Sequence, residues 1–191
     1  MNINAAIDIP LWIEIFSKAR SWAVDLLNNV HKELYQPCTS EEHRKFLLLK
    51  VQAAIIQFEL CSGFLNLVMT PENCFARKVI LKSIIHIVFE YRITLKNHHI
   101  KTLLDLCDSK SFNSEKENLA KIIKEYRKAI KQIDKFQELR IKATGHYDPD
   151  IATQVSLIES INENESIETI KIFISFNNHI LESLSKIGRK K

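Results

Sequence analysis

Glycine and proline are scarce in this chain of 191 residues, which contains three glycines and four prolines. Folds built from many strands and tight turns use more of both residues, because glycine and proline form the reversals between strands. The glycines are also far apart, at positions 63, 145 and 188, so the chain has no glycine-rich phosphate loop. This spacing excludes P-loop and dinucleotide-binding proteins.

The four cysteines show neither the CxxC pair of a metal site nor the spacing of a compact disulfide framework. Cys61 and Cys107 lie within apolar helical patterns and are predicted to be core residues, which favours a reducing environment. His86 and the pair His98–His99 have no carboxylate or cysteine at ligand spacing beside them. We therefore expect no metal site and no other cofactor.

The first residues lack a basic region followed by an apolar run and a cleavage site, so we expect no secretory signal. Lys, Gln, Glu or His interrupt the apolar stretches, so we expect each of them to be shorter than a membrane span. These features predict a cytoplasmic protein without membrane contact. The net charge of +4 and the isoelectric point near 8.8 are compatible with an RNA partner.

Apolar residues recur at helical spacing along most of the chain, and alternating strand patterns are absent. We predict an all-α fold, with residues 1–191 forming a single domain, a bundle of about six or seven helices. Ser114 and the pair Asp148–Pro149 are predicted to cap the fifth and sixth helices. The second helix is predicted to begin at a capping box, Thr39–Glu42, which precedes an apolar run at 46–69. The other predicted helices cover about residues 8–35, 70–96, 98–107, 114–144, 151–161 and 166–186, and a basic tail follows at 188–191.

The fifth predicted helix is amphipathic when its residues are placed at about 100° intervals. Lysines on its polar side form either a solvated surface, the commoner role of lysine on a helix, or a contact for an RNA backbone. The apolar face comprises Leu119, Ile122, Ile123, Tyr126, Ile130 and Ile133, and the opposite face comprises Lys121, Lys124, Lys128, Lys131, Lys135 and Lys142.

Arg140 projects onto the apolar face of this helix and not onto the lysine face. A charged side chain there needs a carboxylate, a carbonyl or a phosphate, because burying it unpaired costs several kcal/mol. Two interpretations follow: Arg140 forms a structural ion pair or reaches solvent from the end of the bundle, or it meets a ligand anion in a cleft.

His146 follows the helix-ending Gly145, so the helical pattern does not fix its direction. A histidine near a helix end commonly contacts a terminal carbonyl, yet its pKa near 6.5 also suits proton transfer at neutral pH. Tyr147 either packs against the protein or offers its hydroxyl to a phosphate. Asp148 fits an N-terminal cap better than a catalytic role.

The segment Arg140-Ile-Lys-Ala-Thr-Gly-His146 resembles the motif of the HEPN superfamily of helical proteins. In that family an arginine and a histidine, four to six residues apart, lie at the end of a long helix in a small α-bundle. The likeness covers about residues 115–161, within a predicted helical hairpin at about 114–162. Two positions differ from the family pattern: Ile141 replaces the usual polar residue, and Tyr147 follows the histidine directly.

The resemblance implies a metal-independent endoribonuclease of a bacterial conflict system, with two motifs facing each other across a homodimer cleft. It implies that His146 transfers a proton to or from the ribose or leaving-group oxygen and that Arg140 stabilises charge on the phosphate. Arg140 and His146 are thus the candidate catalytic residues, with Tyr147 as a weaker third.

Two other functional classes stay open. Ile141 favours a non-enzymatic immunity protein or antitoxin that binds and neutralises a cognate toxin, and a structural or regulatory helical module is the third class. The first helix carries Trp12, Phe16 and Trp22 among many aliphatic residues. Such a helix either packs into the core or docks on another subunit or partner.

Overall fold

The computed structural model describes residues 9–37, 40–109, 111–145 and 150–189. Within these ranges the chain is helical and contains no strand, which confirms the predicted all-α fold, and it forms six continuous helical segments. The segments are α1 (Ile9–Leu34); α2 (Glu41–Met69); α3 (Phe75–Thr94) continued by the π-helical turn η1 (Leu95–His99) and α4 (Ile100–Ser109); α5 (Asn113–Gln132) continued by the 3₁₀ turn η2 (Ile133–Phe136), the short α6 (Gln137–Leu139) and the π-helical turn η3 (Arg140–Gly145); α7 (Ile151–Glu159); and α8 (Glu163–Arg189).

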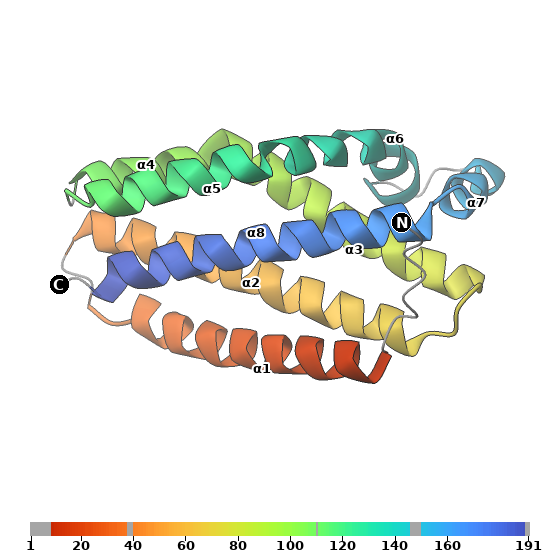
Figure 1. The fold of residues 1–191 in the computed structure, drawn as a ribbon, viewed down its shortest axis with the longest axis horizontal. Coiled ribbons are helices and arrows are strands. Elements are labelled where there is room, and N and C mark those ends of the chain that lie inside the picture. Colours follow the sequence, from red (N-terminus) through yellow and green to blue (C-terminus); the bar gives the residue numbers. More distant parts are fainter. Residues whose placement is uncertain (1–8, 38–39, 110, 146–149, 190–191) are drawn as a thin grey trace, which may run out of the picture.

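The long helices run roughly along one axis of the molecule (Figure 1). Helices α2 and α8 lie in the middle, α1 packs on α2, and α5 packs on α8 and on α4. Helix α3 contacts both α2 and α8, and α7 lies at the end of the bundle against α3 and η3. This arrangement brings the end of the α5 segment, which carries Arg140, next to α3.

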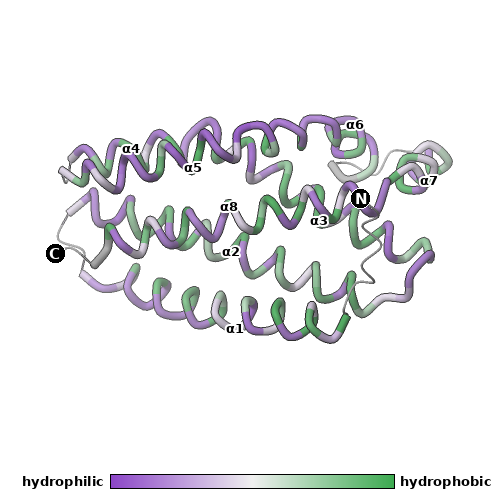
Figure 2. The backbone as a smooth tube through the Cα atoms, in the orientation of Figure 1, coloured by the Kyte–Doolittle hydropathy of each residue, from purple (hydrophilic) through white to green (hydrophobic). Residues whose placement is uncertain are grey.

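Helix α2 is the main core helix. Twelve of its residues are buried, against two in α5, because α2 is covered by α1, α3 and α8 while α5 has one side facing outward. Gly63 allows α2 and α3 to approach closely, since a Cβ atom there would lie 2.8 Å from Cγ1 of Ile84. Figure 2 shows hydrophobic stretches along α2.

Helix α2 is also long and apolar enough to cross a membrane, judged by length and composition alone. The expectation that polar residues keep every apolar stretch short of a membrane span therefore fails for this helix. Half of its most apolar stretch is buried inside the protein, and the core helix of a soluble protein passes the same test.

A buried polar contact joins α8 to α2. The side-chain amide of Asn177 donates hydrogen bonds to the carbonyl oxygen of Ala53 at 3.0 Å and to Oε1 of Gln57 at 2.9 Å. Both side chains are fully buried. Because buried polar groups need partners, this contact fixes the position of α8 along α2.

Arg77 joins three helices at the corner between α2 and α3. Its Nε donates to Oε2 of Glu163 in α8 at 2.8 Å, and its Nη1 donates to the carbonyl oxygens of Leu67 at 2.8 Å and Thr70 at 3.0 Å. The side chain is 7% exposed. The last carbonyls of a helix have no intrahelical donor, so Arg77 satisfies the end of α2.

Several predicted helix ends differ from the structure. Helix α5 begins at Asn113 after Phe112, and the hydroxyl of Ser114 donates to Glu115 at 2.8 Å, so Ser114 is not the cap. Asp150 caps α7 by accepting from the backbone N–H groups of Ala152 and Thr153. The predicted cap at Asp148–Pro149 is thus replaced by the next acidic residue, and residues 146–149 lie outside the described ranges.

Two further boundaries were predicted wrongly. The break expected between residues 96 and 98 is absent, because α3 and α4 join through η1 without leaving the helical conformation. Helix α8 starts at Glu163 and continues to Arg189, through part of the predicted basic tail. Asn162 accepts a hydrogen bond from the backbone of Glu165 at 3.1 Å, which is a side-chain contact typical of a helix start.

Candidate functional site

The site predicted from the sequence begins on the amphipathic helix α5. Its predicted apolar face is confirmed: Leu119, Ile122 and Ile133 are buried, and Ile123, Tyr126 and Ile130 are half-buried against the core. The hydroxyl of Tyr126 lies 2.9 Å from the hydroxyl of Ser175 in α8. The predicted lysines, Lys121, Lys124, Lys128, Lys131, Lys135 and Lys142, lie on the exposed side.

The end of this segment departs from regular α-helical geometry. The 3₁₀ turn η2 is tighter than an α-helix and the π-helical turn η3 is wider, so one helical wheel does not describe the segment. Ile133, Leu139 and Ala143 nevertheless stay buried. These three apolar residues hold the segment on the core while the backbone changes its winding, and Arg140 begins the π-helical turn.

Arg140 forms an ion pair with Glu90 of α3. Its Nε donates to Oε1 of Glu90 at 2.5 Å, and the side chains are 36% and 42% exposed. The pair joins residues that are fifty positions apart in the sequence. The first of the two interpretations of Arg140, an ion pair within the protein, is therefore present. The side chain is also partly exposed, so its guanidinium contacts solvent.

Two other ion pairs hold the same segment. Arg92 of α3 pairs with Asp134 of η2, and Lys135 of η2 pairs with Glu165 of α8. Asp134 and Glu165 are both more than 40% exposed, which weakens such pairs through solvent screening. Helix α3 thus supplies one charged side chain, Arg92, to the α5 segment about two turns before Arg140, and another, Glu90, at Arg140 itself.

Glu90 also lines an open groove between α2 and α3 with a volume of about 210 Å³. Burial raises the pKa of Tyr91 far above its usual range, so its hydroxyl stays protonated at neutral pH. The lining of the groove combines apolar side chains with two carboxylates and an imidazole. Its lining residues are Gln52, Ile56 and Glu59 of α2 and His86, Ile87, Glu90, Tyr91 and Thr94 of α3.

Neither Glu90, the partner of Arg140, nor His86, which lines the groove beside Glu90, was predicted from the sequence as a site residue. His86 and Glu90 are four residues apart on one helix, a spacing that places both on the same side of α3. Two metal ligands can share a helix face at that spacing, so the expectation that no carboxylate lies at ligand spacing beside His86 is wrong. Arg140, which pairs with Glu90, comes from a distant segment that no local pattern connects to α3.

The other two candidate residues, His146 and Tyr147, lie outside the described residues. The chain on either side of them is fixed: the amide of Gln154 in α7 donates to the carbonyl oxygen of Ala143 in η3 at 3.3 Å. Ile141, which follows Arg140, is 51% exposed. The predicted pairing of Arg140 with His146 thus stays a prediction, while the position of Arg140 is settled.

The two adjacent histidines of η1, His98 and His99, have different surroundings. Burial, and to a smaller extent the charge of His98, lowers the pKa of His99, whose ring packs edge-on against Tyr91 at 5.9 Å between centroids. His98 is exposed on η1. Across the part of the chain that the structure describes, no group of three His, Cys, Asp or Glu residues is placed to hold a metal ion.

Two of the cysteines are core residues, as predicted. Cys61 and Cys107 are buried, and burial raises the pKa of the Cys61 thiol to about 11 and also raises the pKa of Cys107. Since the thiolate is the reactive form of cysteine, both side chains are poor nucleophiles at neutral pH. Neither of these two cysteines is therefore a candidate nucleophile.

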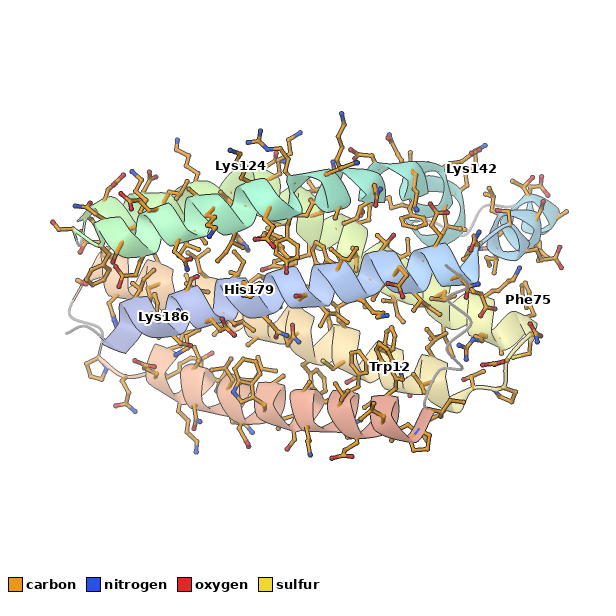
Figure 3. All side chains as sticks on the ribbon, in the orientation of Figure 1. Trp12, Phe75, Lys124, Lys142, His179 and Lys186 are labelled. Carbon is orange, nitrogen blue, oxygen red and sulfur yellow. The ribbon has the colours of Figure 1, made fainter. Side chains whose placement is uncertain are left out.

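Figure 3 shows how side chains are distributed over the molecule: Lys124 and Lys142 project from the outer edge formed by α5 and η3, whereas Trp12 lies on the opposite side of the bundle. The resemblance to the HEPN superfamily rests on the Arg140–His146 motif alone. Comparison of the chain with known protein families, with curated proteins and with solved structures finds no match.

Proposed function

We propose that the protein is a HEPN-like, metal-independent endoribonuclease of a bacterial conflict system, with Arg140 and His146 as its catalytic residues. The observation that carries the proposal is the position of Arg140. It lies partly exposed on a π-helical turn and is held by Glu90, an exposed carboxylate that itself lines the groove between α2 and α3. Irregular helical turns of this kind are frequent at functional sites.

A phosphodiester competes with Glu90 for the guanidinium of Arg140. Arginine pairs with phosphate through two parallel hydrogen bonds, and an exposed ion pair contributes at most about 1 kcal/mol, so the exchange requires little energy. His146 then removes the proton from the ribose 2′-hydroxyl or donates one to the leaving 5′-oxygen. Arg140 stabilises the charge that develops on the phosphate.

The test is cleavage of total RNA in EDTA by the purified protein. Arg140→Ala is expected to lower the rate by about 10²–10³-fold, because it removes stabilisation of the developing charge. His146→Ala is expected to lower it by about 10²–10⁴-fold, because it removes proton transfer. Cleavage that is unchanged in both variants, or absent in the wild type, contradicts the proposal.

Glu90→Gln is the matched control, because it breaks the same ion pair as Arg140→Ala but leaves the guanidinium in place. We expect Glu90→Gln to retain cleavage and to bind RNA at least as tightly as the wild type, since the competing carboxylate is neutralised. If Glu90→Gln abolishes cleavage as completely as Arg140→Ala, the ion pair has a structural role and Arg140 is not catalytic.

A second candidate function, an immunity protein or antitoxin, is favoured by the outer surface of α1. Leu11, Ile15 and Trp22 are 49%, 48% and 45% exposed, and their spacing of four and seven residues places them on one side of the helix. Exposed apolar side chains in a row suit a protein partner, and tryptophan contributes strongly to such interfaces.

The second candidate is tested by co-expression with the product of a neighbouring gene that arrests growth. The double variant Ile15→Ser/Trp22→Ser is expected to lose protection, whereas Ile172→Ser, at an exposed apolar position on α8, is expected to retain it. Protection that survives the double variant contradicts a role for α1. Cleavage of RNA in EDTA that depends on Arg140 would instead support the first candidate.

A further inference from the structure

The positive charge of the protein is concentrated in one segment. Between Asn113 and Gly145 there are nine lysines and arginines against five aspartates and glutamates, an excess of four that equals the net charge of +4 of the whole chain. The remainder of the chain carries eighteen residues of each sign. The excess therefore belongs to the α5 segment and not to the protein surface in general.

Five cations of this segment form a continuous surface, which we call the lysine face: Lys121, Lys124, Arg127, Lys128 and Lys131. All five side chains are exposed. Among the residues that the structure describes, none of the five has a carboxylate within ion-pair distance, whereas most other cations of the α5 segment, such as Lys116 and Lys142, are paired.

The acidic residues close to the lysine face do not neutralise it. Asp134 pairs with Arg92 of α3, and Glu138 pairs with Lys142. Glu125 lies within the same helix but forms no ion pair with the five cations in the described structure. The local field of the lysine face is therefore positive and attracts a polyanion.

The geometry of the lysine face suits a linear polyanion. Its members follow one another at intervals of three, three, one and three residues, and side chains three or four apart on a helix lie about 5–6 Å from each other. From Lys121 to Lys131 the row extends about 15 Å along the helix axis. Figure 3 shows Lys124 and, farther along the same edge, Lys142, which lies within η3.

We propose that the lysine face binds the sugar–phosphate backbone of single-stranded RNA and guides it toward η3. This inference rests on the proposed ribonuclease function and supplies the substrate-binding surface for it. Arg140 is not part of the lysine face, because its Nε is directed inward to Glu90 of α3. Binding of the RNA backbone and the chemistry at Arg140 are thus assigned to different residues.

A membrane surface fits the lysine face less well. A helix that lies on a membrane inserts apolar side chains beside its cations. The apolar side of α5 packs instead against α8, and no large exposed apolar residue occurs among the described residues of α5. Figure 2 shows hydrophilic stretches along the outer edge of α5, consistent with a partner that is charged throughout.

The test measures binding of a fluorescein-labelled single-stranded RNA in EDTA by fluorescence anisotropy over a range of salt concentrations. The variant Lys124→Gln/Lys128→Gln/Lys131→Gln removes three cations without lowering helix propensity appreciably. Each lost phosphate contact lowers the slope of log affinity against log salt by about 0.7 for a single strand. We expect the slope of the triple variant to be less steep than that of the wild type by about 2.

The matched control is Lys18→Gln/Lys32→Gln/Lys45→Gln, which removes the same charge from exposed positions on α1 and α2. The control is expected to keep the slope of the wild type. Equal losses in both triple variants would show that net charge alone drives binding and would overturn the proposal. Wild-type protein that binds anionic phospholipid vesicles but not RNA would also overturn it.

The experiment separates this inference from the proposed catalysis. RNA binding that depends on the lysine face, without cleavage in EDTA, supports the binding surface and contradicts the ribonuclease. In the opposite outcome, cleavage depends on Arg140, but the lysine-face triple variant changes neither cleavage nor RNA affinity. That outcome contradicts the binding surface and leaves the ribonuclease proposal intact. Circular dichroism spectra of both triple variants should match that of the wild type, since every substituted side chain is exposed.

Discussion

Arg77 and Arg140 each pair with a glutamate through Nε, but their surroundings differ. Arg77, at the corner between α2 and α3, is 7% exposed and also donates to two carbonyl oxygens at the end of α2. Arg140, in η3, is 36% exposed and pairs with Glu90 of α3, which is 42% exposed. A desolvated arginine depends on all its protein partners, whereas an exposed one can exchange a partner for water or for a ligand anion.

The comparison shows that an arginine–glutamate pair does not by itself define a role. The Arg77 pair joins α2, α3 and α8 inside the core, and its function is structural. The Arg140 pair closes the contact between α3 and η3 at the surface, beside an open groove. Burial therefore separates a structural arginine from a candidate ligand-binding arginine in this protein.

The largest effect is expected for Arg77→Met. Removal of the buried guanidinium leaves the carbonyl of Thr70 and Glu163 without this donor, and leaves the carbonyl of Leu67 with the backbone N–H of Thr70 alone. This loss should lower the free energy of unfolding by about 3 kcal/mol. Urea denaturation followed by circular dichroism measures this change. Arg140→Met, the matched variant, should lose less than about 1 kcal/mol. Similar losses in the two variants would contradict the distinction between them.

An intermediate effect is expected for stabilisation by ligand. Saturating single-stranded RNA should raise the unfolding free energy of the wild type and of Arg77→Met by the same amount, because Arg77 does not contact the surface. Arg140→Met should lose about 1.4 kcal/mol of this stabilisation for each tenfold loss of affinity. Thermal unfolding with and without RNA provides the measurement. Equal stabilisation of all three proteins would contradict a contact between Arg140 and the RNA.

A smaller effect is expected for the coupling energy of each pair. A double-mutant cycle on Arg140 and Glu90 should give less than about 1 kcal/mol and should fall at high salt, since exposed charges are screened. The cycle on Arg77 and Glu163 should give a larger value that changes less with salt. A strong and salt-insensitive coupling at Arg140 would place it with Arg77 as a structural residue.

Much of the fold could be predicted from local patterns. The two faces of α5 were predicted correctly, because an apolar stripe at helical spacing must be covered, and its lysines must face water. Helix ends were predicted less well where several residues can serve as caps. Asp150 replaces Asp148, for example, and Ser114 bonds to its neighbour Glu115 instead of the backbone.

The candidate site could be predicted only in part. A charge on an apolar face needs a partner, and the sequence left two for Arg140, an ion pair within the protein or a ligand anion; the structure shows the ion pair. Its partner Glu90 is fifty residues away, and only the packing of η3 against α3 brings the two together. The structural role of Arg77 was not predicted for a related reason. Its hydrogen bonds depend on where α2 ends and α8 begins, and both positions follow from the assembled bundle.

The π-helical turn η1 has a consequence for how α3 and α4 share one buried stripe. Side chains advance by about 100° per residue in an α-helix, and a π-helical turn accommodates one residue more than an α-helical turn. The turn at Leu95–His99 therefore keeps Leu103 and Cys107 in phase with Val88 and Leu95, all of which are buried.

Deletion of the exposed Asn97 would convert this turn to an ordinary α-helical one and leave the stripe in phase on both sides. We expect the shortened chain to stay within about 1 kcal/mol of the wild type in urea denaturation. Deletion of Lys82, inside the regular part of α3, would instead rotate the following core residues by about 100° and unfold the protein. At η1, one residue of length is thus dispensable to the packing of the bundle.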